Sequence, residues 1–119
     1  MPLTMEHERE NTFRLDLQGR LTEVDFDTCE QQLEKEILRR GRVRLLIVLE
    51  RFTGWEPDAP WNDPSFHMQH GDAIERIAIV GPHRWRSHML IFAGADLRKA
   101  PVEYFPLGTA ADGRAWLSS

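Results

Sequence analysis

The sequence lacks the features that would assign it to a membrane or to an oxidising compartment. It has a single cysteine, Cys29, among 119 residues, so no disulfide can form within the chain. No apolar run approaches the roughly 20 residues that span a bilayer. The first ten residues contain no apolar core of a signal peptide. We therefore expect a cytoplasmic protein, at most peripheral to a membrane.

Phosphate-binding and catalytic motifs are also missing. The sequence contains neither GxGxxG nor GxxxxGK[ST], and no serine lies in a GxSxG turn. Its net charge of −4 disfavours a general nucleic-acid binder, because contact with phosphates requires a basic surface. The sequence therefore predicts no cofactor, no nucleic-acid partner and no catalytic residue.

One pair of histidines leaves a metal site open as an alternative. His67 and His70 are three residues apart on an expected helix and would share one face, with Asp63 and Asp72 nearby. Zinc needs three or four converging ligands, and the sequence offers no firm third one. A metal-dependent enzyme around these histidines is the third of our hypotheses.

Alternation and apolar runs predict the strands. The composition, 41% hydrophobic and 29% charged, is that of one globular domain over residues 1–119. Residues 3–8 and 13–18 alternate between apolar and polar, and the short link between them predicts an antiparallel hairpin. Near-continuous apolar runs predict three further strands, at 43–49, 77–80 and 102–105.

Helices are expected between these strands. The strongest spans about 22–40, where Thr22 is an N-cap, Cys29, Leu33 and Ile37 share an apolar stripe, and Gly41 ends the helix. Further helices are expected at about 62–72, 83–95 and 108–117. This order predicts an α/β fold with a mostly parallel sheet of about five strands and an N-terminal hairpin.

The middle third of the chain is unusually rich in large apolar side chains. Residues 51–64 are predicted to form a proline-stiffened loop after a central strand, where α/β sheets commonly bind ligands. We interpret six residues as candidates to line an apolar cleft: Trp55, Trp61, Phe66, Trp85, Met89 and Phe92. The alternative interpretations are that these side chains only complete the core between helices, or that they form a dimer contact.

The beginning of the expected 83–95 helix is basic. Arg84 and Arg86 are our candidates for contact with an anionic membrane surface, and His83 and His88 lie beside them. A basic segment next to apolar residues also fits contact with a protein partner.

These residues resemble a known family. The segments GRLTEVDFDTCEQQLEKEI, GRVRLLIVLERFTGWEP and ERIAIVGPHRW, with VEYFPL and a terminal AWL, are similar to the SpoIIAA-like proteins of bacteria, relatives of the STAS domain. The resemblance runs from about Phe13 to Leu117. It implies a compact α/β domain, and it points to an apolar ligand or a membrane bound through the two middle helices, as in lipid-carrying CRAL-TRIO domains.

The resemblance departs from the anti-sigma-factor antagonists at one position. Those proteins carry a phosphorylatable serine in an Asp-Ser-Ser-Gly-like turn after the third strand, where this chain reads Glu50-Arg51-Phe52-Thr53-Gly54. A phosphate on Thr53 would be repelled by Glu50 and Glu56. We therefore do not expect a phosphorylation switch here.

Two main hypotheses follow. The first is a non-catalytic module that binds an apolar ligand or a membrane surface. The second is a STAS-like regulatory module that binds a partner protein or a second copy of itself.

Overall fold

The computed structural model describes residues 3–57, 71–95 and 99–119. Its sheet has the strand order β1-β2-β3-β4-β5, in which only β1 runs antiparallel to its neighbour. The strands are β1 (Leu3–Arg9), β2 (Thr12–Leu21), β3 (Val43–Trp55), β4 (Ile74–Gly81) and β5 (Val102–Pro106). The described helices are α1 (Glu23–Arg40), α3 (Arg86–Phe92) and α4 (Ala110–Leu117), with 3-10 turns η1 (Gly71–Ala73) and η2 (His83–Trp85). The predicted architecture is confirmed.

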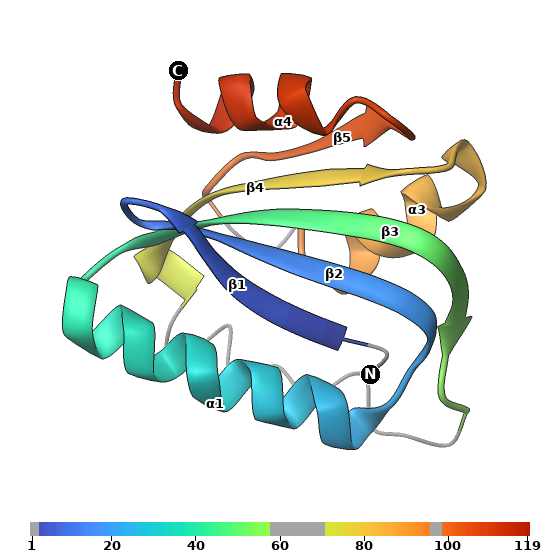
Figure 1. Cartoon of the computed structure of the whole chain (residues 1–119), viewed down its shortest axis with the longest axis horizontal. Helices are drawn as coiled ribbons and strands as arrows, with labels where there is room; N and C mark the ends of the chain where they lie inside the picture. Colours follow the sequence, from blue (N-terminus) through green and yellow to red (C-terminus); the bar gives the residue numbers. More distant parts are fainter. Residues whose placement is uncertain (1–2, 58–70, 96–98) are drawn as a thin grey trace.

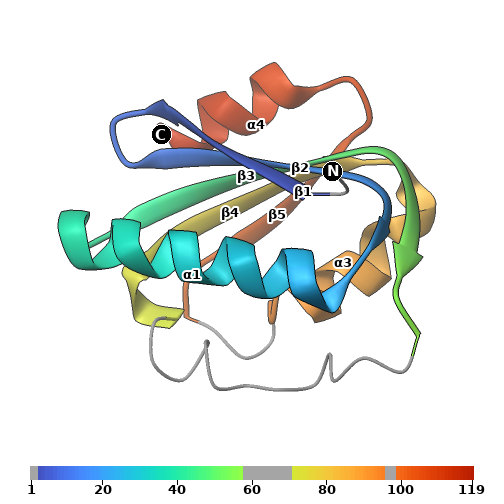
Figure 2. The ribbon, with the colours of Figure 1, turned by 60° about the horizontal axis from the view of Figure 1, so that its bottom comes forward.

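Helices cover both faces of the sheet (Figure 1). Figure 2 shows α1 and α3 on one face and α4 on the other. The crossovers from β2 to β3, through α1, and from β4 to β5, through α3, each join neighbouring parallel strands in the same direction across the sheet. Because such crossovers are right-handed, α1 and α3 lie on the same face. The sheet consequently separates a large apolar cluster under α1 and α3 from a small one under α4.

The ends of α1 follow the local sequence signals. The Thr22 side chain accepts a hydrogen bond from the backbone N–H of Asp25 at 3.2 Å, as expected of an N-cap. Gly41 has φ +87° and its N–H donates to the carbonyl of Ile37 at 2.7 Å.

The predicted loop at 51–64 was wrong in its first part, because β3 continues to Trp55. The strand is prolonged because β2 runs on beside it, pairing Gly19 with Phe52 and Leu21 with Trp55. The register shifts between Leu17 and Gly19 and again between Gly19 and Arg20, and Arg51 takes φ +53° at this irregularity, as in a β-bulge. The remainder of that predicted loop, from residue 58, lies outside the described residues.

The later helices are shorter than the sequence predicts. The expected 83–95 helix begins as the turn η2 and ends at Phe92, because Gly94 with φ +72° leaves the helical conformation. The helix α4 begins at Ala110, two residues later than expected. Of the helix expected at 62–72, only residues 71–72 are described, and they belong to η1.

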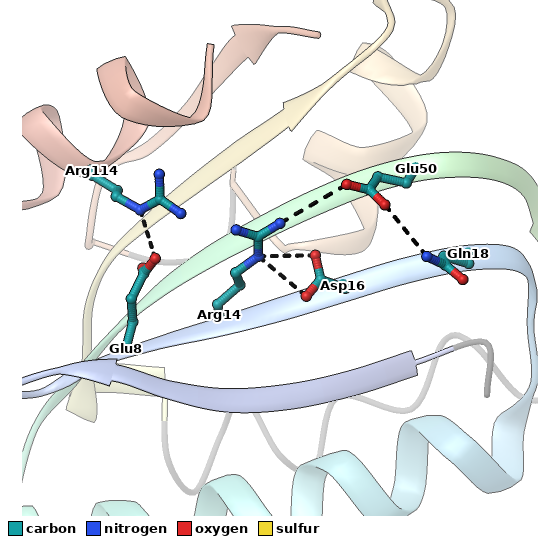
Figure 3. A network of polar contacts seen from close by, with 6 residues as sticks. All are labelled: Glu8, Arg14, Asp16, Gln18, Glu50 and Arg114. Atoms are coloured by element: carbon teal, nitrogen blue, oxygen red, sulfur yellow. Dashed lines mark hydrogen bonds and ion pairs between the residues drawn. The ribbon is translucent and has the colours of Figure 1, made fainter. Parts of the chain in front are cut away.

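Polar side chains occupy the α4 face of the sheet where α4 does not cover it (Figure 3). Arg114 of α4 donates to Glu8 of β1 at 2.6 Å. Arg14 contacts Asp16 at 3.0 Å and Glu50 at 4.0 Å, and Gln18 also reaches Glu50, at 3.4 Å. Each charged side chain of this network therefore has a partner of opposite charge within the domain.

Candidate ligand-binding site

A cluster of aromatic rings joins the end of β3 to η2, α3 and α1. Its members are Phe52, Trp55, Trp85, Phe92 and Phe26. The ring centroid of Phe52 lies 5.0 Å from that of Trp85 and 5.1 Å from that of Trp55, and the centroids of the two tryptophans are 5.8 Å apart. The ring centroid of Phe92 lies 5.4 Å from that of Trp55 and 5.2 Å from that of Phe26. Most of these pairs meet edge to face or tilted, an arrangement that aromatic quadrupoles favour. The cluster therefore fixes α3 against the extended end of β3.

The two indole nitrogens of the cluster differ. Trp85 Nε1 donates to the carbonyl oxygen of Phe52 at 3.1 Å, which sets the orientation of the ring. Trp55 Nε1 is buried and has no hydrogen-bond partner, and no other buried side-chain nitrogen or oxygen of the described residues shares this condition. An unsatisfied buried donor costs about 1–3 kcal/mol. Trp55 thus retains a donor within an otherwise apolar cluster.

The structure brings together only part of the predicted cleft. Trp55, Trp85 and Phe92 are half-buried and in contact with one another. Met89 has no exposed surface and packs in the main core. Trp61 and Phe66 lie outside the described residues.

A pocket opens beside this cluster, between the inner face of α1 and the sheet. Its cavity volume is about 80 Å³. The described residues that line it are apolar except for Glu30: Leu3, Leu15, Leu17, Leu21, Phe26, Cys29, Glu30, Leu33, Leu45, Ile47, Ile74, Ile77, Phe92 and Ala93. This volume is smaller than that of sites for drug-sized molecules, about 300–1,000 Å³, so the pocket has room only for a small or narrow ligand.

Sequence reasoning missed most of this pocket. Of the six predicted residues, only Phe92 is among the described residues that line it. The apolar stripe of α1 and the inward residues of β2 and β3 had been assigned to the core. One signal was available: a single helical stripe, Phe26 to Ile37, faces a sheet surface with many more large apolar residues than it can cover.

Both candidate anion contacts are exposed. The Arg84 guanidinium carbon lies 6.0 Å from the centre of the Trp85 ring. Arg86 stands at the start of α3, near enough to Tyr104 to lower the pKa of that phenol, although burial raises this pKa by more. Neither arginine forms an ion pair in the described part of the chain.

The described residues also bear on metal binding and on thiol chemistry. No group of three or more histidine, cysteine or acidic side chains among them could hold a metal ion, and His67 and His70 lie outside the described residues. Burial raises the pKa of the Cys29 thiol to about 12, with a smaller contribution from Glu30. The thiol therefore stays protonated at neutral pH and forms part of an apolar wall.

Comparison with known proteins identifies the fold and the family. No helix of the described residues has the length and apolarity needed to cross a bilayer. The chain is similar to a protein of the DUF3478 family from Shewanella loihica PV-4, described as having a SpoIIAA-like fold, with 19% identity, a TM-score of 0.73 and coverage of 97% of this chain and 91% of the other. It is also similar to the anti-sigma factor antagonist SpoIIAA in its unphosphorylated form, with 13% identity, a TM-score of 0.64 and coverage of 96% and 97%.

A comparison with curated proteins gives no match. The model of the SpoIIAA-like family, in contrast, matches residues 12–118, nearly the whole chain. This protein therefore belongs to the SpoIIAA-like family.

Proposed function

We propose that this protein is a non-catalytic binding module of the cytoplasm that binds a short aliphatic ligand in the pocket between α1 and the sheet. The observation that carries the proposal is the composition of the pocket wall. Among the described residues that line the pocket, Glu30 is the only charged one. An apolar cavity is costly to leave empty, because the side chains around it lose packing contacts. Occupation by a ligand would recover that loss.

The wall also defines the chemistry of the ligand. Leucine, isoleucine and phenylalanine side chains give no directional hydrogen bonds, so recognition depends on shape and on apolar area removed from water. Each methylene group buried contributes about 0.8 kcal/mol, which corresponds to roughly a fourfold gain in affinity. A linear aliphatic ligand fits these conditions.

Binding of 1-alkanols to the pocket should therefore strengthen with chain length. We expect roughly a fourfold gain per methylene among the shortest alkanols, and an early plateau, because a cavity of about 80 Å³ fills quickly. Displacement of a bound fluorescent naphthalene dye measures the affinities. Affinities that do not change with chain length would contradict the proposal.

Filling the pocket should abolish this effect. Leu33 is buried and lines the pocket, so Leu33→Phe should weaken alkanol binding about tenfold or more. Leu38 lies on the same helix and is 75% exposed, so Leu38→Phe is a matched control that should bind like the unaltered protein. Equal binding by both variants would place the ligand elsewhere.

Association with a membrane surface is the other form of this proposal. It would use Arg84 and Arg86 together with Ile91, which is 77% exposed. The remaining apolar side chains of α3 offer less support, because Met89 is fully buried and Phe92 is half-buried. Flotation with phosphatidylglycerol vesicles separates the two forms: co-flotation at low salt supports the membrane, and its absence leaves the free ligand.

A second candidate function is regulatory binding of a partner protein. The fold likeness to an anti-sigma factor antagonist favours it, since that protein is described by its action on another protein. In this candidate the domain presents a surface rather than a pocket.

A further inference from the structure

Four exposed arginines lie at the end of the molecule where the parallel strands finish. They are Arg20 on β2, Arg51 on β3, Arg84 on η2 and Arg86 at the start of α3. Arg20 is in register with Gly54, so the ends of β2 and β3 lie side by side, and η2 packs on β3 through the bond from Trp85 to Phe52. Figure 1 shows these segments at one end of the sheet. We call these four residues the arginine edge.

The arginine edge differs from most other arginines of the described residues. Arg39 and Arg40 contact Glu36, Arg42 and Arg44 contact Glu75, and Arg114 contacts Glu8, whereas Arg9 and Arg76 donate to hydroxyl or carbonyl oxygens near the C-terminus. No member of the arginine edge lies within 4.0 Å of a carboxylate of the described residues. The adjacent Glu50 is already engaged by Arg14 and Gln18 (Figure 3). A chain of net charge −4 thus holds four exposed arginines without a carboxylate partner among the described residues at this end, although Glu23 and Glu56 also lie there.

Arg51 provides a second, independent observation. Its φ of +53° lies in the left-handed region, which is unfavourable for most residues other than glycine, asparagine and aspartate. The neighbouring bulge positions show that the sequence uses glycine where it needs such angles, at Gly19 and Gly54. Arg51 is exposed, so burial does not explain why this position carries a long cationic side chain, and strain of this kind is characteristic of functional positions.

We propose that the arginine edge is a docking surface for an acidic segment of a partner protein. This inference rests on the second candidate function above and gives it a location and a charge. Guanidinium groups bind carboxylates in a bidentate manner, and their spread over four elements suits an extended acidic segment. A membrane would require an apolar face among the arginines, and of the large exposed apolar residues of the described chain only Ile91 lies on an element of the arginine edge, whereas Val24 and Leu38 lie on α1 and Leu107 follows β5. The net negative charge opposes a nucleic acid.

The test uses the full chain and a twelve-residue peptide of alternating glutamate and serine, with a glycine–serine peptide as the neutral control. We expect the acidic peptide to shift the backbone amide NMR signals of residues 19–21, 51–54 and 83–87 at low salt, and the shifts to vanish as salt screens the charges. Arg51→Glu with Arg84→Glu should weaken binding about tenfold or more. Lys35→Glu with Lys99→Glu changes the net charge equally at exposed sites outside the edge and should bind normally.

A second variant separates docking from folding. Arg51→Gly removes the strain and should raise the melting temperature by about 3 °C while weakening peptide binding. Unchanged binding in the Arg51→Glu/Arg84→Glu variant, or tighter binding of phosphatidylglycerol vesicles or single-stranded DNA than of the peptide, would overturn the proposal. A negative result with the acidic peptide would overturn the arginine edge as the docking surface but not partner binding at another surface. Alkanol binding tests the pocket separately.

Discussion

Replacing Phe52 with alanine will lower the free energy of unfolding by about 4 kcal/mol, a large part of the stability of a domain of this size. Phe52 is among the largest fully buried side chains and contacts both Trp55 and Trp85. Its removal leaves a cavity at the junction of β3, η2 and α3, and the edge-to-face contacts are lost with it. Urea denaturation followed by tryptophan fluorescence measures the change.

The neighbouring residue provides the control for this variant. Thr53 is exposed, so Thr53→Ala should change the free energy of unfolding by less than about 0.5 kcal/mol. Phe52→Leu should cost about 1–2 kcal/mol and keeps the measurement possible if the alanine variant does not fold. A cost for Phe52→Ala below that of Phe52→Leu would contradict the described packing.

The Cys29 thiol of the folded protein will react with iodoacetamide about 10³-fold more slowly than the same thiol in the denatured chain at pH 8. Burial raises its pKa from 9.0 to about 12, and the thiolate is the reacting species. The rate should rise about tenfold per pH unit from pH 8 to pH 10, without levelling off near pH 9. The single cysteine allows mass spectrometry to follow one labelled site.

This measurement also reports on the pocket, because Cys29 is part of its wall. An alkanol that occupies the pocket should slow the labelling further, whereas Leu38→Phe should leave it unchanged. Labelling of the folded protein within tenfold of the denatured rate would mean that the thiol is accessible.

The raised pKa of Cys29 also has a consequence for stability. The folded state favours the neutral thiol. The contribution of Cys29 to the free energy of unfolding is therefore complete below pH 9 and declines as the pH rises toward 12.

Local signals account for the elements that the sequence predicts well. The run from Val43 to Leu49 reads as a buried strand whatever surrounds it, because branched and leucine side chains on both faces need cover. Thr22 and Gly41 mark the ends of α1 through backbone hydrogen bonds formed within a few residues. Right-handed crossovers then leave few arrangements for the sheet.

The end of β3 shows where such signals fail. Prolines and a glycine after Leu49 indicate a loop, yet the strand continues because β2 supplies partners for Phe52 and Trp55. That pairing joins residues about 33 positions apart, so no local window contains it. The same limit applies to Met89, which the sequence groups with the tryptophans and the tertiary structure buries completely.

The amino-acid sequence by itself determined the strand and helix content, the mixed sheet with its hairpin and the family resemblance, because each depends on periodicity or on short spacings. The tertiary structure alone decided which apolar residues fill the core and which line a pocket, and which arginines find a carboxylate. Those outcomes depend on side chains contributed by several elements distant in the sequence. Packing and charge pairing are properties of such assembled surfaces, so they are fixed only when the sheet and its helices are in place.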